Sequence, residues 1–217
     1  THRRTIRLVK ELNEEFNCKT AVLADLQGPK LRIGDVEDGA IINEGDVLTF
    51  TTNKVRGTAK LVYMNYQQFP QDVNAGERIL LDDGKLMCEV LETNKKDTVV
   101  TKVIQGGPLK SKKGVNLPNT KVSLPCLTKK DLEDVVVAME EGVEWIGLSF
   151  VRDAADVNEL RKIINDFGSF AKIVSKIEKP EAVVDIDKII DATDAIMVAR
   201  GDLGVEIPYS SVPMVQK

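Results

Sequence analysis

The strongest constraint on the fold is an alternation of strand-like and helix-like segments that occupies the chain after residue 125. Three apolar runs of strand length, 144–148, 172–176 and 195–199, are separated by longer segments whose apolar residues recur at helical spacing. Successive β/α units of this kind build parallel strands covered by helices. The pattern fits an open doubly wound sheet and a closed barrel equally well.

The helices between these runs carry N-terminal signals. Thr128, with Asp131 three positions later, predicts a capping box for a helix that runs to Glu141. Asp153 predicts the cap of the next helix, and Pro180 predicts the first residue of a third. The apolar residues at helical spacing, which we expect on the inner faces, are Val157, Leu160 and Ile164 in the second helix and Val183, Ile186 and Ile190 in the third.

The first residues of the chain follow the same pattern, whereas the long segment after them does not. A helical pattern over residues 3–17 is followed by an apolar run, which predicts a buried strand that ends at Asp25. From residue 33 onward, short alternating runs lie between Gly, Asp and Asn turns, and Asp82-Asp83-Gly84 predicts a hairpin turn rather than a metal site. We therefore expect an all-β, barrel-like domain over residues 33–122, inserted into an α/β domain of residues 1–32 and 123–217.

Composition and charge narrow the classes of function. Hydrophobic residues make up 42% of the 217 residues, which is enough for a substantial core. A net charge of −4 leaves no basic footprint, so we expect no binding to nucleic acid. Three widely spaced cysteines and a single histidine, His2, argue against a disulfide framework and a Cys/His metal site, and they fit buried thiols in a reducing cytoplasm. Without a long apolar run or a signal-peptide core, we expect neither membrane insertion nor secretion.

Polar residues follow each predicted strand, and parallel α/β folds place their active sites at these strand ends. The residues are Asp25, Ser149, Lys176 with Glu178, and Arg200-Gly201-Asp202. Lys176 and Glu178 are two positions apart, so in an extended strand they project from the same face. Burying both charges is costly unless they pair or hold an ion, so a salt bridge and an ion site are both open interpretations.

A magnesium site could use two of these strand ends. Glu178 and Asp202, from neighbouring strands, offer two hard oxygen ligands, and substrate oxygens and water would complete the shell of a Mg²⁺ ion. Lys176 beside that ion could neutralise charge on a transferring phosphoryl group. Gly201 precedes a short helical turn whose free N–H groups could receive a carboxylate or a phosphate, although an ordinary turn explains this glycine as well.

Six segments, in order along the chain, resemble the pyruvate kinase family. They are Asp25-Leu-Gln-Gly-Pro-Lys-Leu-Arg32, Lys112-Lys-Gly-Val-Asn-Leu-Pro118, Leu127-Thr-Lys-Lys-Asp131, Leu148-Ser-Phe-Val-Arg152, Lys176-Ile-Glu-Lys-Pro180 and Ile196-Met-Val-Ala-Arg-Gly-Asp-Leu-Gly204. The resemblance implies a partial (β/α)8 TIM barrel, with the β-rich domain inserted after the third barrel strand as a mobile lid over the nucleotide. It implies a cytoplasmic enzyme of glycolysis that transfers phosphoryl from phosphoenolpyruvate to ADP, with Mg²⁺ or Mn²⁺, and a homotetrameric parent.

The resemblance also implies roles in the transfer for four of these residues. Lys176 is similar to the lysine that stabilises the transferring phosphoryl group. Glu178 and Asp202 are similar to the protein ligands of the catalytic Mg²⁺. Gly201 and Asp202 match backbone contacts to the substrate.

Nucleotide and monovalent-cation contacts are implied in the same way. Arg32 and, on the lid, Lys113 match residues that contact the nucleotide phosphates, and Asp25 matches a ligand of the activating monovalent cation. Lys30 stands where K⁺-dependent members carry Glu, and Leu26 stands where they carry the Thr that contributes a K⁺ ligand. We therefore expect the ammonium of Lys30 to act at the monovalent-cation site, so that K⁺ is not required.

Two alternatives from other classes stay open. A Mg²⁺-dependent pyruvate aldolase on a similar barrel would use two carboxylates in the same way, although the lid insertion and the Lys-x-Glu pair argue against it. The chain could also be a non-catalytic piece. It begins without Met inside a predicted helix, and the family's first two barrel strands would precede Thr1. We therefore expect a piece of a longer protein that shows no turnover alone.

Overall fold

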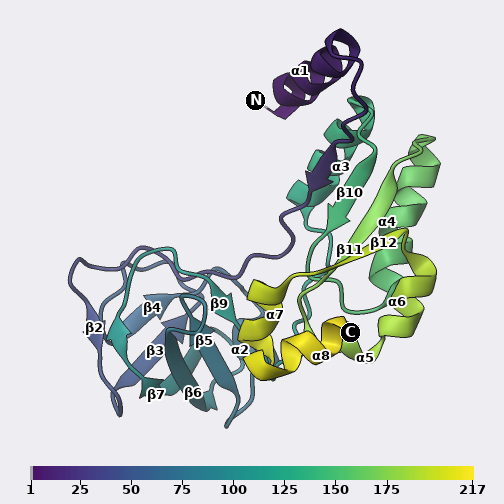
Figure 1. The fold of residues 1–217 in the computed structure, drawn as a ribbon. Coiled ribbons are helices and arrows are strands. Elements are labelled where there is room, and N and C mark those ends of the chain that lie inside the picture. The colour runs from purple at the N-terminus through teal and green to yellow at the C-terminus, as the bar shows by residue number, and fades with distance from the viewer. Residues whose placement is uncertain (1) are drawn as a thin grey trace. The chain divides into compact units, whose positions relative to one another are not determined.

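The computed structural model describes residues 2–217, and these residues divide into two compact units (Figure 1). The first, called the α/β unit below, contains residues 2–29, 125–203 and 212–217. The second, called the β-rich unit, contains residues 30–124 and 204–211. No helix within residues 2–217 combines the length and the apolar character that crossing a membrane requires.

A parallel sheet forms the centre of the α/β unit. Its order is β1 (Leu23–Asp25), β10 (Trp145–Leu148), β11 (Lys172–Ile177) and β12 (Ala195–Val198), and each neighbouring pair is parallel. The helices are α1 (His2–Glu15), α3 (Lys129–Glu140), α4 (Ala154–Phe167), α5 (Pro180–Val184), α6 (Ile186–Ala192), α7 (Arg200–Glu206), which runs on into the range of the β-rich unit, and α8 (Val212–Gln216). Side chains from both layers, among them Ile146, Ile173 and Leu160, are buried between sheet and helices.

The predicted helix starts are confirmed. The hydroxyl of Thr128 accepts from the backbone N–H of Asp131 at 3.1 Å, and the Asp131 carboxylate accepts from the backbone N–H of Thr128 at 2.9 Å. Asp153 caps α4 by accepting from the backbone N–H groups of Ala155 and Asp156. These caps satisfy amide groups that the first turn of a helix leaves without intrahelical partners.

Two sequence predictions in this unit are wrong. The strand before Asp25 ends where predicted but is not buried: β1 spans Leu23–Asp25, and within residues 2–217 it pairs only with β10. The helix predicted after Pro180 is two helices, because Asp185 leaves the helical conformation with φ −100° and ψ 21°. The break changes the phase of α6, so that Ile189 is buried and Ile190 is 48% exposed.

The β-rich unit is built on a six-stranded sheet of order β4-β3-β7-β6-β5-β9. All neighbours pair antiparallel except β3 and β4. Its elements are β2 (Ile41–Ile42), β3 (Val47–Thr51), β4 (Leu61–Tyr63), α2 (Phe69–Asp72), β5 (Arg78–Leu81), β6 (Leu86–Thr93), β7 (Thr98–Gln105), β8 (Gly107–Pro108), β9 (Val115–Asn116) and the short 3-10 helix Tyr209–Ser211, and β2 pairs with β8. Phe50 and Phe69 meet edge to face in its core, with ring centroids 5.7 Å apart. The predicted hairpin turn at Asp82-Asp83-Gly84 is confirmed between β5 and β6.

Candidate active site

The polar strand ends of the α/β unit meet at one edge of its sheet, because all four strands are parallel. Asp25 is the last residue of β1, Ser149 directly follows β10, and Glu178 directly follows β11. Lys176 lies in β11 itself, two positions before Glu178. Lys176 contacts the side chains of Glu178, Asp25 and Ser149, so the structure brings together four residues that the sequence analysis singled out.

Lys176 lies at the centre of this cluster. Its Nζ atom is 3.0 Å from Glu178 Oε1, 3.2 Å from Asp25 Oδ1 and 3.0 Å from Ser149 Oγ. The side chain is only 14% exposed. Burial lowers the pKa of Lys176, but the carboxylates of Glu178 and Asp25 more than offset this and leave the pKa raised. Lys176 therefore carries its positive charge throughout the physiological pH range.

Glu178 is the most buried charged group of the cluster, with its side chain 2% exposed. Its Oε2 atom accepts from the backbone N–H of Phe150 at 3.1 Å, while Oε1 faces Lys176. Burial raises the pKa of Glu178, the Lys176 ammonium and the Phe150 N–H counteract this rise, and the negative charge of Asp202 adds to it. The remaining rise comes first from burial, which disfavours the charged carboxylate.

Asp202 and Gly201 lie in the first turn of α7, which follows β12, and β12 is the strand that pairs with β11 in the sheet. The influence of Asp202 on the pKa of Glu178 places the two carboxylates within electrostatic range of each other. Among residues 2–217, no group of three or more His, Cys, Asp and Glu side chains has the arrangement of a metal site. Glu178 and Asp202 offer carboxylate oxygens, which are donors of the kind that Mg²⁺ takes together with substrate oxygens and water.

The other predicted site residues, Lys30, Arg32 and Lys113, belong to the β-rich unit. Arg32 donates from Nη1 to the backbone oxygen of Lys112 at 2.9 Å, which ties its guanidinium to the segment that carries Lys113. Lys113 Nζ lies 2.9 Å from Asp82 Oδ1, and hydrogen bonding to Lys113 holds the pKa of Asp82 below its usual value. The ion-pair partner of Lys113 is thus a residue that the sequence indicated only as part of a turn.

Three residues make contacts around the cluster that the sequence did not predict. The hydroxyl of Ser149 donates to the backbone oxygen of Leu26 at 2.7 Å, a partner far away in the sequence. Phe150 has a left-handed backbone with φ +56°, and this conformation accompanies the contact of its N–H with Glu178. Asp131 does more than cap α3, because its Oδ1 also accepts from the backbone N–H of Gly28 at 3.1 Å, in the loop after β1.

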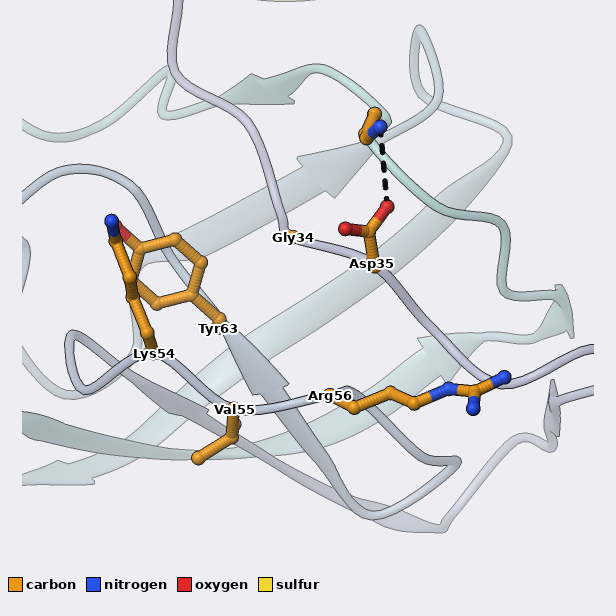
Figure 2. A pocket seen from close by; sticks show the side chains of 7 residues that line it. Gly34, Asp35, Lys54, Val55, Arg56 and Tyr63 are labelled. Carbon is orange, nitrogen blue, oxygen red and sulfur yellow. Dashed lines mark ion pairs between the residues drawn. The ribbon is translucent and has the colours of Figure 1, made fainter.

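A separate hollow of about 540 Å³ lies on the β-rich unit (Figure 2). Figure 2 shows Lys54 beside the ring of Tyr63 and Arg56 extending away from it, and the remaining lining residues are Gly34, Asp35, Val55 and Lys112. The dashed line marks the ion pair of Lys112 with Asp35, at 3.3 Å. The charged side chains around the hollow are exposed, and neither Arg32 nor Lys113 lines it. It is therefore distinct from the predicted nucleotide contacts and lacks a buried polar group that would fix a ligand.

Comparison with known proteins identifies the family. The family model described as "Pyruvate kinase, barrel domain" matches residues 1–217. Proteins named "Pyruvate kinase" are 43% identical in Corynebacterium glutamicum, 42% in Geobacillus stearothermophilus and 41% in Mycobacterium tuberculosis H37Rv. Each match covers 100% of this chain, but only 46%, 37% and 46% of the respective relative, so the chain spans less than half of their length. The family assignment agrees with the α/β fold and its curled half-barrel sheet. The chain belongs to the pyruvate kinase family.

Proposed function

We propose that this chain supplies part of the active site of a pyruvate kinase, which transfers phosphoryl from phosphoenolpyruvate to ADP and yields pyruvate and ATP. The observation that carries the proposal is the buried Lys176–Glu178 pair at the carboxyl end of β11, with Asp25 in contact and Asp202 within electrostatic range. The names of the relatives support the substrates. A place in cytoplasmic glycolysis and a homotetrameric parent are part of the same proposal and rest on the family alone.

Lys176 acts in this proposal as the electrostatic stabiliser of the phosphoryl group. Phosphoryl transfer spreads negative charge over the equatorial oxygens, so catalysis depends on positioned positive charge more than on covalent chemistry. The ammonium of Lys176 is positive, fixed by three contacts and mostly shielded from water. A preorganised charge of this kind interacts with a transition state more strongly than a solvated one would.

Glu178 and Asp202 would hold the Mg²⁺ ion that the family implies. Burial raises the pKa of Glu178 and the negative charge of Asp202 adds to the rise, so a cation beside the two carboxylates would favour their charged forms. When bound, Mg²⁺, or Mn²⁺ in its place, would supply further positive charge to the phosphoryl oxygens. The backbone of Gly201 and Asp202 would orient the carboxylate of the substrate at the start of α7.

The β-rich unit acts in the proposal as the nucleotide lid, with Arg32 and Lys113 directed to the phosphates of ADP. Lys30 would supply the positive charge that K⁺ provides in other members, in concert with Asp25, so that the enzyme needs no K⁺. We expect the chain alone to show no turnover, because the family's active site draws on barrel strands outside these residues.

The test compares two lysines of the same strand in the full-length protein. Lys176→Met should lower kcat by roughly 100-fold or more, since one preorganised charge contributes on this scale, while the Mg²⁺ requirement stays unchanged. Lys172→Met is the matched control, because Lys172 begins β11 and pairs with Asp194 away from the cluster. Glu178→Gln should instead raise the Mg²⁺ concentration needed for half-maximal rate. If Lys176→Met and Glu178→Gln lowered only thermal stability, the pair would be an ordinary salt bridge and the proposal would fail.

A further inference from the structure

We infer that Ser149 is a positioning residue for Lys176. Its hydroxyl orients the ammonium of Lys176, and the direction of that hydroxyl is itself fixed by a hydrogen bond to the backbone. The inference rests on the proposed function and adds a residue to it. Ser149 directly follows β10, is 2% exposed and lies between the loop after β1 and strand β11. It therefore links the three strands whose ends form the cluster.

The chemistry of the two partners determines how the hydroxyl of Ser149 is oriented. A backbone carbonyl can only accept a hydrogen bond, so the single hydroxyl proton points to Leu26 O, 2.7 Å away. An ammonium can only donate, so the contact of 3.0 Å with Lys176 Nζ uses a lone pair of Ser149 Oγ. Leu26 is itself fixed, because its backbone N–H donates to Gly147 O at 3.0 Å. The oxygen lone pair is therefore held toward Lys176 by a rigid backbone.

This contact completes the coordination of the ammonium. Lys176 has three N–H donors, and its three acceptors are Glu178, Asp25 and Ser149. Of these, the Asp25 side chain is 57% exposed, and it leaves Lys176 if it turns to solvent or to an ion. A lysine side chain is long and flexible, so without Ser149 the two carboxylates alone would set the direction of the ammonium. Because Ser149 is neutral, it fixes direction and leaves the positive charge for the phosphoryl group.

Phe150, the residue after Ser149, orients Glu178. The backbone N–H of Phe150 holds Glu178 Oε2 at 3.1 Å, and its left-handed conformation, with φ +56°, follows directly after Ser149. Two consecutive residues thus determine where the ammonium of Lys176 and the carboxylate of Glu178 point. Ser149 is the member of this pair that a side-chain substitution can test.

The experiment uses the full-length protein and two buried serines. Ser149→Ala should lower kcat by about 10- to 100-fold, the usual effect of a misplaced catalytic group, with KM for both substrates and the affinity for Mn²⁺ changed less than about threefold. Ser175→Ala is the matched control, since Ser175 is also fully buried, precedes Lys176 in β11 and pairs with Thr193 Oγ1 at 2.9 Å. It should lower the melting temperature by a similar amount and leave kcat within about twofold. Ser149→Thr keeps the hydroxyl and should restore most of kcat.

The outcomes separate this inference from the proposed function. Equal kcat values for Ser149→Ala and Ser175→Ala, together with an inactive Lys176→Met, would overturn the role of Ser149 alone. A full kcat in Lys176→Met would overturn the proposed function. If Ser149→Ala does not fold, Ser149→Cys takes its place, because it keeps the side-chain size but has only a weak donor and acceptor. A kcat of Ser149→Cys equal to that of the wild-type protein would then refute the inference.

Discussion

Gly28 is the position where one added methyl group should disturb both the stability of the α/β unit and the candidate site. Its φ is +66°, a left-handed conformation that costs a non-glycine residue about 1–2 kcal/mol. A Cβ atom there would lie 2.7 Å from Phe150 Cδ2 and 3.2 Å from Ser149 Cβ, closer than packed carbon atoms approach. Overpacking of this kind costs about 1–3 kcal/mol, so Gly28→Ala should lose roughly 2–5 kcal/mol in total.

Gly168, in the same unit, serves as a control that separates the cost of the left-handed backbone from the cost of the close contact with Phe150. Gly168, the C-cap of α4, has φ +74°, and no atom lies within 4 Å of an added Cβ. Gly168→Ala should therefore lose only the left-handed cost of about 1–2 kcal/mol. Urea unfolding followed by the fluorescence of Trp145, the only tryptophan, reports on this unit because Trp145 begins β10.

The Gly28→Ala substitution should also affect the candidate site, because Phe150 orients Glu178. The added methyl group has to displace the ring or the loop of Phe150, whose N–H orients Glu178. In the full-length protein, Gly28→Ala should thus raise the Mg²⁺ concentration for half-maximal rate, and Gly168→Ala should not. Pro29 also restricts residue 28, so a double-mutant cycle with Phe150→Ala isolates the contact. Equal stability losses at the two glycines, or no coupling between Gly28→Ala and Phe150→Ala, would refute the reasoning.

Three further predictions concern other parts of the molecule. A thiol reagent at pH 8 should label exposed Cys18 in the folded chain but neither of the other cysteines, since burial raises the pKa of Cys88 to about 11 and that of Cys126 further still; three fast labels would contradict this. Burial and the hydrogen bond to Asp72 raise the pKa of Tyr66 to about 12, above the unfolded value near 10. The stability that the protonated Tyr66 hydroxyl contributes is therefore complete below pH 10 and lost as the pH rises to about 12. Tyr66→Phe should abolish this loss in urea unfolding measured against pH. The full-length protein should run without K⁺ or Na⁺, and Lys30→Glu should make it depend on K⁺, whereas a wild-type requirement for millimolar K⁺ would contradict the role of Lys30.

The periodicity of β11 made its part of the site predictable. Alternation along a strand sends residues two apart to one face, and Lys176 and Glu178 do contact each other. Ser175, between Val174 and Lys176, points to the opposite side and bonds Thr193. The capping box of α3 was equally predictable from the sequence, because Thr128 and Asp131, which bond each other, are only three positions apart. Local patterns therefore predicted the features that depend on neighbours in the chain.

Features that depend on distant segments were not predictable in this way. Within residues 2–217, β1 pairs on one side only, and a local sequence pattern does not encode how many neighbours a strand has. The break at Asp185 lies within a run whose spacing fits one continuous helix, and the carboxylate of Asp185 accepts from the backbone N–H of Ala154 at 3.2 Å. That contact with the start of α4 comes from tertiary packing, which overrides helix propensity.

The contacts around Glu178 show the same limit at the level of chemistry. Three segments far apart in sequence have to agree there: Gly28 leaves room for the ring of Phe150, Phe150 adopts φ +56°, and its N–H reaches Glu178 Oε2. No pair among these residues has a spacing that suggests contact, and a phenylalanine after a strand is ordinarily read as packing. The hydrogen bond from the Phe150 N–H matters because Glu178 is buried: it counteracts the rise in the pKa of Glu178 that burial causes. Charged residues at strand ends thus indicate where a site lies, whereas the neutral groups that aim them are identified only once the fold has brought the strands together.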